Sequence, residues 1–148
     1  MSKIIDIKHL NLRSDLAETI EVLCTCAAWL SEEISLSGLG RDHKSTSGQN
    51  TDGDKQKKLD VIADNLFRSN LEKSVVGFYA SEEQEHIQKF TNDGKIGVAI
   101  DPLDGSSNID CNVSIGTIFS IKDIQDKNSP EIDFFQLGNY LGTGYFIY

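Results

Sequence analysis

The order of the hydrophobic patterns predicts an α+β fold for this chain of 148 residues. Two long stretches with the spacing of amphipathic helices come first. Short apolar runs of strand length follow them, separated by brief connections. A strictly alternating doubly wound domain would interleave helices and strands, so we expect the helices and the sheet to form separate layers.

The first helix is predicted to begin near Asp15 and to end at Gly38. Asp15 is followed three residues later by Glu18, which is typical of a capped helix start, and glycine is typical of a helix end. Spacings of three and four residues place one apolar stripe along this helix. The stripe consists of Leu16, Ile20, Leu23, Ala27, Leu30 and Ile34.

Residues 41–54 contain no apolar side chain and cannot pack into a core, so we expect a mobile loop there. A second helix is predicted from about Lys57 to Leu71, because apolar residues again recur on one side. Beyond it, the apolar runs predict four strands. Their ranges are Val75–Ala80, Ile96–Ile100, Val113–Ile121 and Gly144–Tyr148.

The last predicted strand coincides with the end of the sequence. A run this apolar normally pairs inside a sheet, and a chain that stops in it leaves an exposed edge of the kind native proteins avoid. We therefore expect part of a larger protein, with residues 1–148 forming a domain that is incomplete at its C-terminus. Expressed alone, these residues are expected to associate or aggregate.

Composition excludes several classes of function. The chain carries 23 acidic and 14 basic residues, a net charge of −9, which opposes bulk attraction to nucleic acid. Its apolar runs are too short to span a bilayer, and its start lacks the pattern of a signal peptide. The three cysteines are Cys24, Cys26 and Cys111, and an odd number without an export signal argues against a disulfide framework. We expect a cytoplasmic protein that binds neither nucleic acid nor membranes.

Acidic residues follow two of the predicted strands directly. Asp101 and Asp104 come after one strand, and Glu82 and Glu83 come after the strand before it. Carboxylates at strand ends are common in the ligand sites of open sheets, and adjacent carboxylates repel unless a cation lies between them. With the carbonyl of Leu103 they form a set of hard oxygen ligands suited to Mg²⁺ or Mn²⁺.

The residues around this motif favour a tight turn. Pro102 and Gly105 are predicted to fold the chain so that Asp101 and Asp104 converge. The next residues, 105–107, offer consecutive N–H groups and two hydroxyls, which could hold an anion. A bare Asp-x-x-Asp pattern is more often an ordinary surface turn, and the second acidic pair is what favours a site here.

Residues 101–110, DPLDGSSNID, together with 112–119, resemble the signature of class I fructose-1,6-bisphosphatases, in the Mg²⁺-dependent, Li⁺-sensitive sugar-phosphatase superfamily. Residues 53–60, 81–83 and 144–148 match that family in order and approximate spacing. The resemblance implies a layered αβαβα fold of which this chain is the N-terminal portion, with two long helices and then a mixed, mostly antiparallel sheet. The C-terminal sugar-binding domain would be absent.

The resemblance also implies an activity: metal-dependent hydrolysis of the 1-phosphate of fructose 1,6-bisphosphate, in gluconeogenesis, with two or three Mg²⁺ or Mn²⁺ ions per site. The implied metal ligands are the carboxylates of Glu82, Asp101 and Asp104 and the carbonyl of Leu103. The 1-phosphate would be held by Asp104, Gly105, Ser106 and Ser107. The implied catalytic residues are Glu83 and Asp60, which would orient and deprotonate the water, and Asp54, which would approach a further metal from the loop.

Other implications of the resemblance remain open. The family is expected to form homotetramers, but its AMP-site pattern is not matched by residues 13–17, so AMP regulation is not expected here. The isolated 148-residue chain is expected to be inactive. The alternatives are a catalytically inactive remnant or interaction module, and an activity toward sedoheptulose bisphosphate or inositol phosphate.

Overall fold

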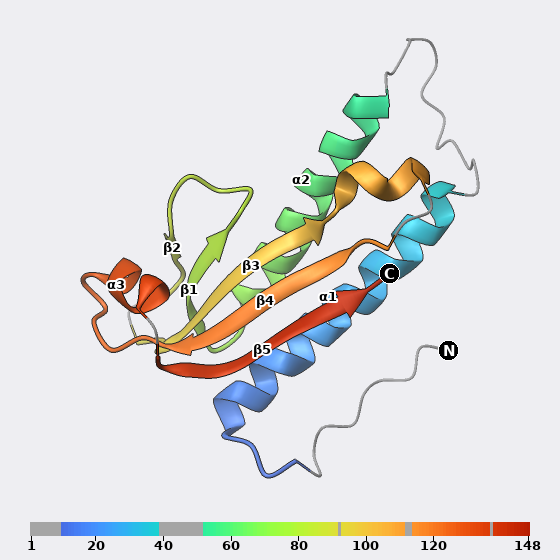
Figure 1. Ribbon diagram of the computed structural model, residues 1–148. Helices are drawn as coiled ribbons and strands as arrows, with labels where there is room; N and C mark the ends of the chain where they lie inside the picture. Colours follow the sequence, from blue (N-terminus) through green and yellow to red (C-terminus); the bar gives the residue numbers. More distant parts are fainter. Residues whose placement is uncertain (1–9, 39–51, 92, 112–113, 137) are drawn as a thin grey trace.

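The computed structural model describes residues 10–38, 52–91, 93–111, 114–136 and 138–148. They form a five-stranded sheet in the order β2-β1-β3-β4-β5, with helices α1 and α2 both on one face (Figure 1). The strands are β1 Val76–Ser81, β2 Gln88–Lys89, β3 Ile96–Asp104, β4 Gly116–Asp123 and β5 Tyr140–Ile147. The helices are α1 Ser14–Gly38, α2 Asp52–Leu71, the 3-10 helix η1 Ser106–Cys111 and α3 Pro130–Phe135.

The predicted fold class is confirmed. The sheet is mixed and mostly antiparallel, because β1 and β3 pair in parallel whereas the pairs β1–β2, β3–β4 and β4–β5 are antiparallel. Two long helices precede the sheet in the sequence, as the hydrophobic patterns indicated. Short elements without a clear hydrophobic period, β2, η1 and α3, were not predicted.

The helix boundaries agree with the prediction at one helix and differ at the other. Helix α1 has the predicted start and end. Helix α2 begins at Asp52, so the prediction of a loop through residue 54 was wrong at its last three positions, Asp54 included. A first helical turn needs no apolar residue, and acidic residues there are stabilised by the helix dipole. Residues 41–51 of the predicted loop lie outside the described residues.

The strand that carries the acidic motif is longer than predicted. We expected β3 to stop at Ile100 and to turn at Pro102, but the strand continues to Asp104. A register shift against β4 between Asp101 and Asp104 accounts for this, since a bulge accommodates a proline inside a strand. The turn comes at Gly105, where φ is +76°. Strand β4 begins at Gly116 rather than at the predicted Val113, and residues 112–113 lie outside the described residues.

The core lies between the two long helices and the sheet. Leu23 and Leu30 of α1, Phe67 of α2, and Val98 and Ile121 of the sheet are all fully buried there. Burial on this scale is the main force that holds helices against a sheet. Cys26 is also part of this core, and burial raises the pKa of its thiol to about 11, as expected for a packing residue without a redox role. Among the described residues, no helix combines the length and hydrophobicity that crossing a membrane requires.

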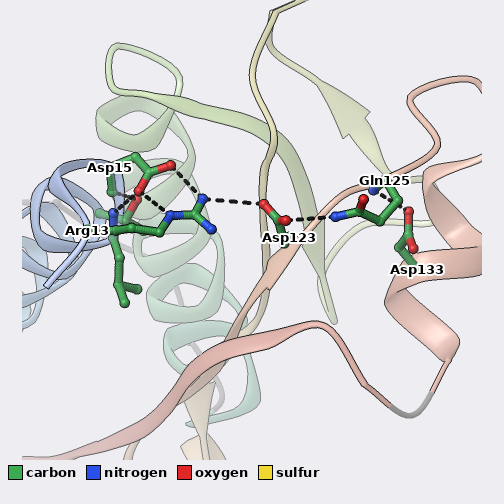
Figure 2. A network of polar contacts seen from close by, with 7 residues as sticks. Arg13, Asp15, Asp123, Gln125 and Asp133 are labelled. Carbon is green, nitrogen blue, oxygen red and sulfur yellow. Dashed lines mark hydrogen bonds and ion pairs between the residues drawn. The ribbon is translucent and has the colours of Figure 1, made fainter.

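A polar network fixes the end of the molecule at which β3 begins. The guanidinium of Arg13 donates to both carboxylate oxygens of Asp15, at 2.9 and 2.7 Å, and reaches Asp123 of β4 at 3.3 Å (Figure 2). Asp123 in turn accepts a hydrogen bond from the side chain of Gln125, whose backbone N–H donates to Asp133 of α3 at 2.7 Å. The start of α1, the end of β4 and the start of α3 are therefore joined through charged hydrogen bonds.

Candidate functional site

The parallel pairing of β1 and β3 brings the two acidic motifs together. Ser81 lies opposite Ile100, and the N–H of Glu82 donates to the carbonyl of Ile100 at 3.0 Å, so the pairing continues one residue beyond β1. Glu82 and Asp101 are consequently neighbours, and their carboxyl groups form a hydrogen bond. Burial, this hydrogen bond and the charge of Glu82 raise the pKa of Asp101 to about 7. The pair therefore holds a proton at a pH where isolated carboxylates are ionised.

The third predicted carboxylate, Asp104, is held by a residue that the sequence analysis missed. The hydroxyl of Tyr145 in β5 donates to Asp104 Oδ2 at 3.0 Å. Gly116, which lies opposite Asp104 in β4, makes this possible. A Cβ at that glycine would lie 2.6 Å from ring atoms of Tyr145, so a larger residue would block the path of the ring. We had interpreted Tyr145 only as part of an apolar strand, and no local pattern distinguishes it.

Tyr145 and Asp101 also line a hollow of about 640 Å³. Ile118, Phe119 and Tyr140 contribute to its wall. Asp101 therefore opens onto a partly apolar surface.

Helix α2 contributes Asp60 to the same region. Its carboxylate accepts a hydrogen bond from Ser106 at the start of η1, which links the helix to the segment after β3. Burial raises the pKa of Asp60, and the nearby charge of Glu82 raises it further, whereas the hydrogen bond from Ser106 lowers it. A carboxylate with these neighbours is a better proton acceptor than an exposed aspartate.

Glu83 completes this group of acids. Its N–H donates to the hydroxyl of Ser81 at 3.2 Å, which closes the turn after β1. Partial desolvation raises the pKa of its side chain, and so do the charges of Asp60, Asp64 and Glu82. Glu83 and Asp60 therefore come from different elements and influence each other electrostatically, as residues of one site do.

The predicted phosphate segment follows directly. After the left-handed Gly105, the N–H of Asn108 donates to the Gly105 carbonyl at 2.8 Å and starts η1. Ser107 is exposed on this turn. The N–H of Leu103 donates to Asp101 Oδ1 at 3.1 Å, and this bond fixes the carboxylate relative to the strand. The metal-ligating role of the Leu103 carbonyl stays a prediction.

The predicted metal ligands are adjacent but not gathered around one point. Glu82 and Asp101 contact each other, while Asp104 is turned to Tyr145. Within the described ranges, no group of three or more His, Cys, Asp or Glu side chains comes close enough to hold a metal ion. The side chain of Asp54 lies outside the described residues, so its predicted role near a further metal stays a prediction.

Comparison with known proteins identifies the family. The family model described as "Fructose-1-6-bisphosphatase, N-terminal domain" matches residues 3–148. A class 1 fructose-1,6-bisphosphatase of Cereibacter sphaeroides is 47% identical over 145 residues, which cover 97% of this chain and 43% of that protein. A class 1 enzyme of Rhodobacter capsulatus is 43% identical over the same shares.

Solved structures give the same result. The holo form of Leishmania major fructose-1,6-bisphosphatase aligns with a TM-score of 0.74 and 26% identity, over 93% of this chain and 44% of that one. The chain thus spans less than half the length of the relatives it matches. With a family model covering nearly every residue, the chain belongs to the fructose-1,6-bisphosphatase family and corresponds to its N-terminal domain.

Proposed function

We propose that residues 1–148 form the metal- and 1-phosphate-binding domain of a fructose-1,6-bisphosphatase, which a sugar-binding domain completes in the family. The observation that carries this proposal is the hydrogen bond between the carboxyl groups of Glu82 and Asp101, where β1 ends beside the parallel strand β3. Two carboxyl groups this close repel each other when both are ionised, and a divalent cation between them removes that repulsion. The names of the relatives supply the substrate class, fructose 1,6-bisphosphate.

The donor set supports a hard cation. Glu82 and Asp101 offer carboxylate oxygens on one side, and Asp104 is the next acidic residue along the same strand. Mg²⁺ or Mn²⁺ would be held by these three residues and by the carbonyl of Leu103, with two or three ions in the completed site. When bound, the cations lower the pKa of the attacking water and neutralise the charge of the phosphate.

Asp60 and Glu83 are proposed to take the proton from that water. Their raised pKa values favour this role, because a general base works best when its pKa approaches the working pH. Ser106 already donates to Asp60, so this hydroxyl would link the base to the phosphate segment, residues 104–107. Asp54 would assist from the start of α2.

The wider setting follows from the same family membership. The proposed role is gluconeogenesis in the cytoplasm, and the proposed assembly is a homotetramer. Residues 13–17 do not carry the AMP-site pattern, so the proposal includes no AMP inhibition.

Metal binding by the chain tests the first half of the proposal. Titration with Mn²⁺ should show binding that Asp101→Asn abolishes, whereas Asp93→Asn, which changes an exposed aspartate, should leave it intact. Equal binding by both variants would contradict the assigned ligands.

Phosphatase activity tests the second half. A chimaera in which residues 3–148 replace the matching part of the Cereibacter sphaeroides relative should release phosphate from fructose 1,6-bisphosphate. It should prefer this compound to sedoheptulose 1,7-bisphosphate and inositol 1-phosphate. The 148 residues alone should bind metal without measurable turnover. A folded chimaera that binds metal but hydrolyses none of the three substrates would favour the reading as an inactive remnant.

A further inference from the structure

We propose that Asp64 is a positioning residue that ties the turn carrying Glu82 and Glu83 to helix α2. The inference rests on the proposed function, because its purpose is to hold Glu83 against Asp60 in the acidic site. It assigns no contact with substrate or metal to Asp64.

The burial of Asp64 is the first observation. Its side chain is only 3% exposed, which is rare for a carboxylate. A buried carboxylate costs free energy unless strong donors surround it. Asp64 Oδ1 accepts a hydrogen bond from the hydroxyl of Tyr79 at 2.9 Å, and Oδ2 accepts one from Gln84 Nε2 at 2.6 Å. Both carboxylate oxygens therefore have a donor, and the bond from Gln84 is short.

Both donors lead to the turn after β1. Gln84 directly follows the acidic pair, and its own N–H donates to the Ser81 carbonyl at 3.1 Å. The hydroxyl of Tyr79 also contacts the hydroxyl of Ser81, which in turn accepts the N–H of Glu83. Asp64 therefore holds the turn from both sides, through Gln84 after the acids and through Tyr79 and Ser81 before them.

On helix α2, Asp64 lies close to Asp60, one of the proposed catalytic residues. Asp60 and Asp64 are four residues apart on α2, so they lie one turn apart on the same side of the helix. The contacts with Asp64 fix the position of the turn along the axis of α2. They therefore also fix the separation between Glu83 on the turn and Asp60 on the helix. Glu83 itself is exposed and its side chain gains no such support from packing. Outer-shell partners of this kind change metal affinity or activity by about 10- to 100-fold when they are removed.

Two single variants with a matched control separate positioning from a merely structural role. Gln84→Leu cuts one link, Tyr79→Phe cuts the other, and Tyr148→Phe makes the same chemical change at a hydroxyl that contacts Thr117 on another part of the sheet. Amide hydrogen exchange at residues 82–84 should accelerate roughly tenfold or more in the first two variants and stay unchanged in Tyr148→Phe. Mn²⁺ affinity should fall about 10- to 100-fold in the same two variants and stay unchanged in the control.

Exchanging the carboxylate and the amide between positions 64 and 84 provides a rescue experiment. Asp64→Asn alone should loosen the turn, because the amide offers one acceptor oxygen to the two donors, Tyr79 and Gln84. Combining it with Gln84→Glu restores an amide–carboxylate pair across the same contact and should recover most of the lost protection and Mn²⁺ affinity. The inference fails if Gln84→Leu behaves like wild type. It also fails if Gln84→Leu, Tyr79→Phe and Tyr148→Phe lose stability alike, without a specific change at residues 82–84. If the wild-type chain binds no Mn²⁺, the proposed function fails instead, and hydrogen exchange still decides the role of Asp64.

Discussion

The acidic residues near the two ends of strand β3 have opposite electrostatic environments. Where the strand begins, Asp15 is paired with Arg13, and Asp133 is buried among N–H donors (Figure 2). Where the strand ends, Asp101 faces Glu82, another acid. Hydrogen bonds lower the pKa of Asp15 and Asp133, whereas burial beside Glu82 raises that of Asp101.

The difference separates stability from function within one sheet. Carboxylates that receive donors stabilise the fold, and those that oppose each other destabilise it unless a ligand supplies positive charge. The carboxylates of the first end, the satisfied end, therefore need no bound ligand. At the second end, the unsatisfied end, Asp101 and Glu82 lack a positively charged partner. This is the expected condition of a binding site.

The largest expected effect concerns turnover at the unsatisfied end. In the chimaera, Glu83→Gln should lower kcat by about 10²- to 10⁴-fold, because the amide cannot accept a proton. Mn²⁺ affinity should stay close to that of the parent. Glu85→Gln, two residues further on, serves as the matched control and should keep full activity. If Asp60→Asn lies on the same proton path, the double variant should be no slower than the slower single variant.

The next effect is on stability at the satisfied end. Asp133 accepts the N–H groups of Gln125 and Asp126, at 2.7 and 3.0 Å, and the side chain of Asn139. Asp133→Ala leaves these donors unpaired and should lower the free energy of unfolding by about 3 kcal/mol, measured by urea denaturation. Glu131→Ala, at an exposed position of the same helix, should change it far less. Equal losses would show that the helix, and not the carboxylate, matters.

Hydrophobic periodicity was sufficient to predict the main elements of the fold. The apolar stripe predicted helix α1, and the Asp15–Glu18 spacing and Gly38 correctly predicted its two ends. The polar start of α2 and the short elements η1 and α3 carry no such period and were missed. The bulge in β3 was missed too, because Pro102 indicates a turn as readily as an irregular strand.

The candidate site was predictable only where acidic residues directly follow a recognisable strand. The positions of the acids directly after two strands indicated that Glu82 and Asp101 would lie together, and the parallel pairing places them side by side. Tyr145 reaches Asp104 from 41 residues away, and Gln84 reaches Asp64 across 20. Contacts of this kind depend on register and on the space left by Gly116, which no single-sequence pattern specifies.

A pH titration should show the two ends acting in opposite directions. Without metal, the folded protein holds the Asp101 proton up to about pH 7, whereas the unfolded chain releases it near the ordinary pKa of 3.8. Asp101 therefore lowers stability as the pH rises from about 4 to 7, and Asp133, whose pKa is lowered, loses its stabilising effect as the pH falls below 3.8.

The check is thermal unfolding in EDTA across this range. Asp101→Asn should remove the decline between pH 4 and 7 and make the metal-free chain more stable than wild type at pH 7. Adding Mn²⁺ should reverse that order, since only wild type retains the ligand. A decline that persists in the variant would assign it to another group.

The smallest expected effect concerns Arg13, whose ion pairs look like the most prominent feature of the satisfied end (Figure 2). Its side chain is 46% exposed, and those of Asp15 and Asp123 are 33% and 25% exposed, so water screens both pairs. Arg13→Ala should therefore cost only about 0.5 kcal/mol, and the cost should shrink further in 1 M NaCl. A double-mutant cycle with Asp123→Asn measures the contact that joins α1 to β4. A coupling as large as the loss in Asp133→Ala would show that this end is held by surface charge and not by the buried carboxylate.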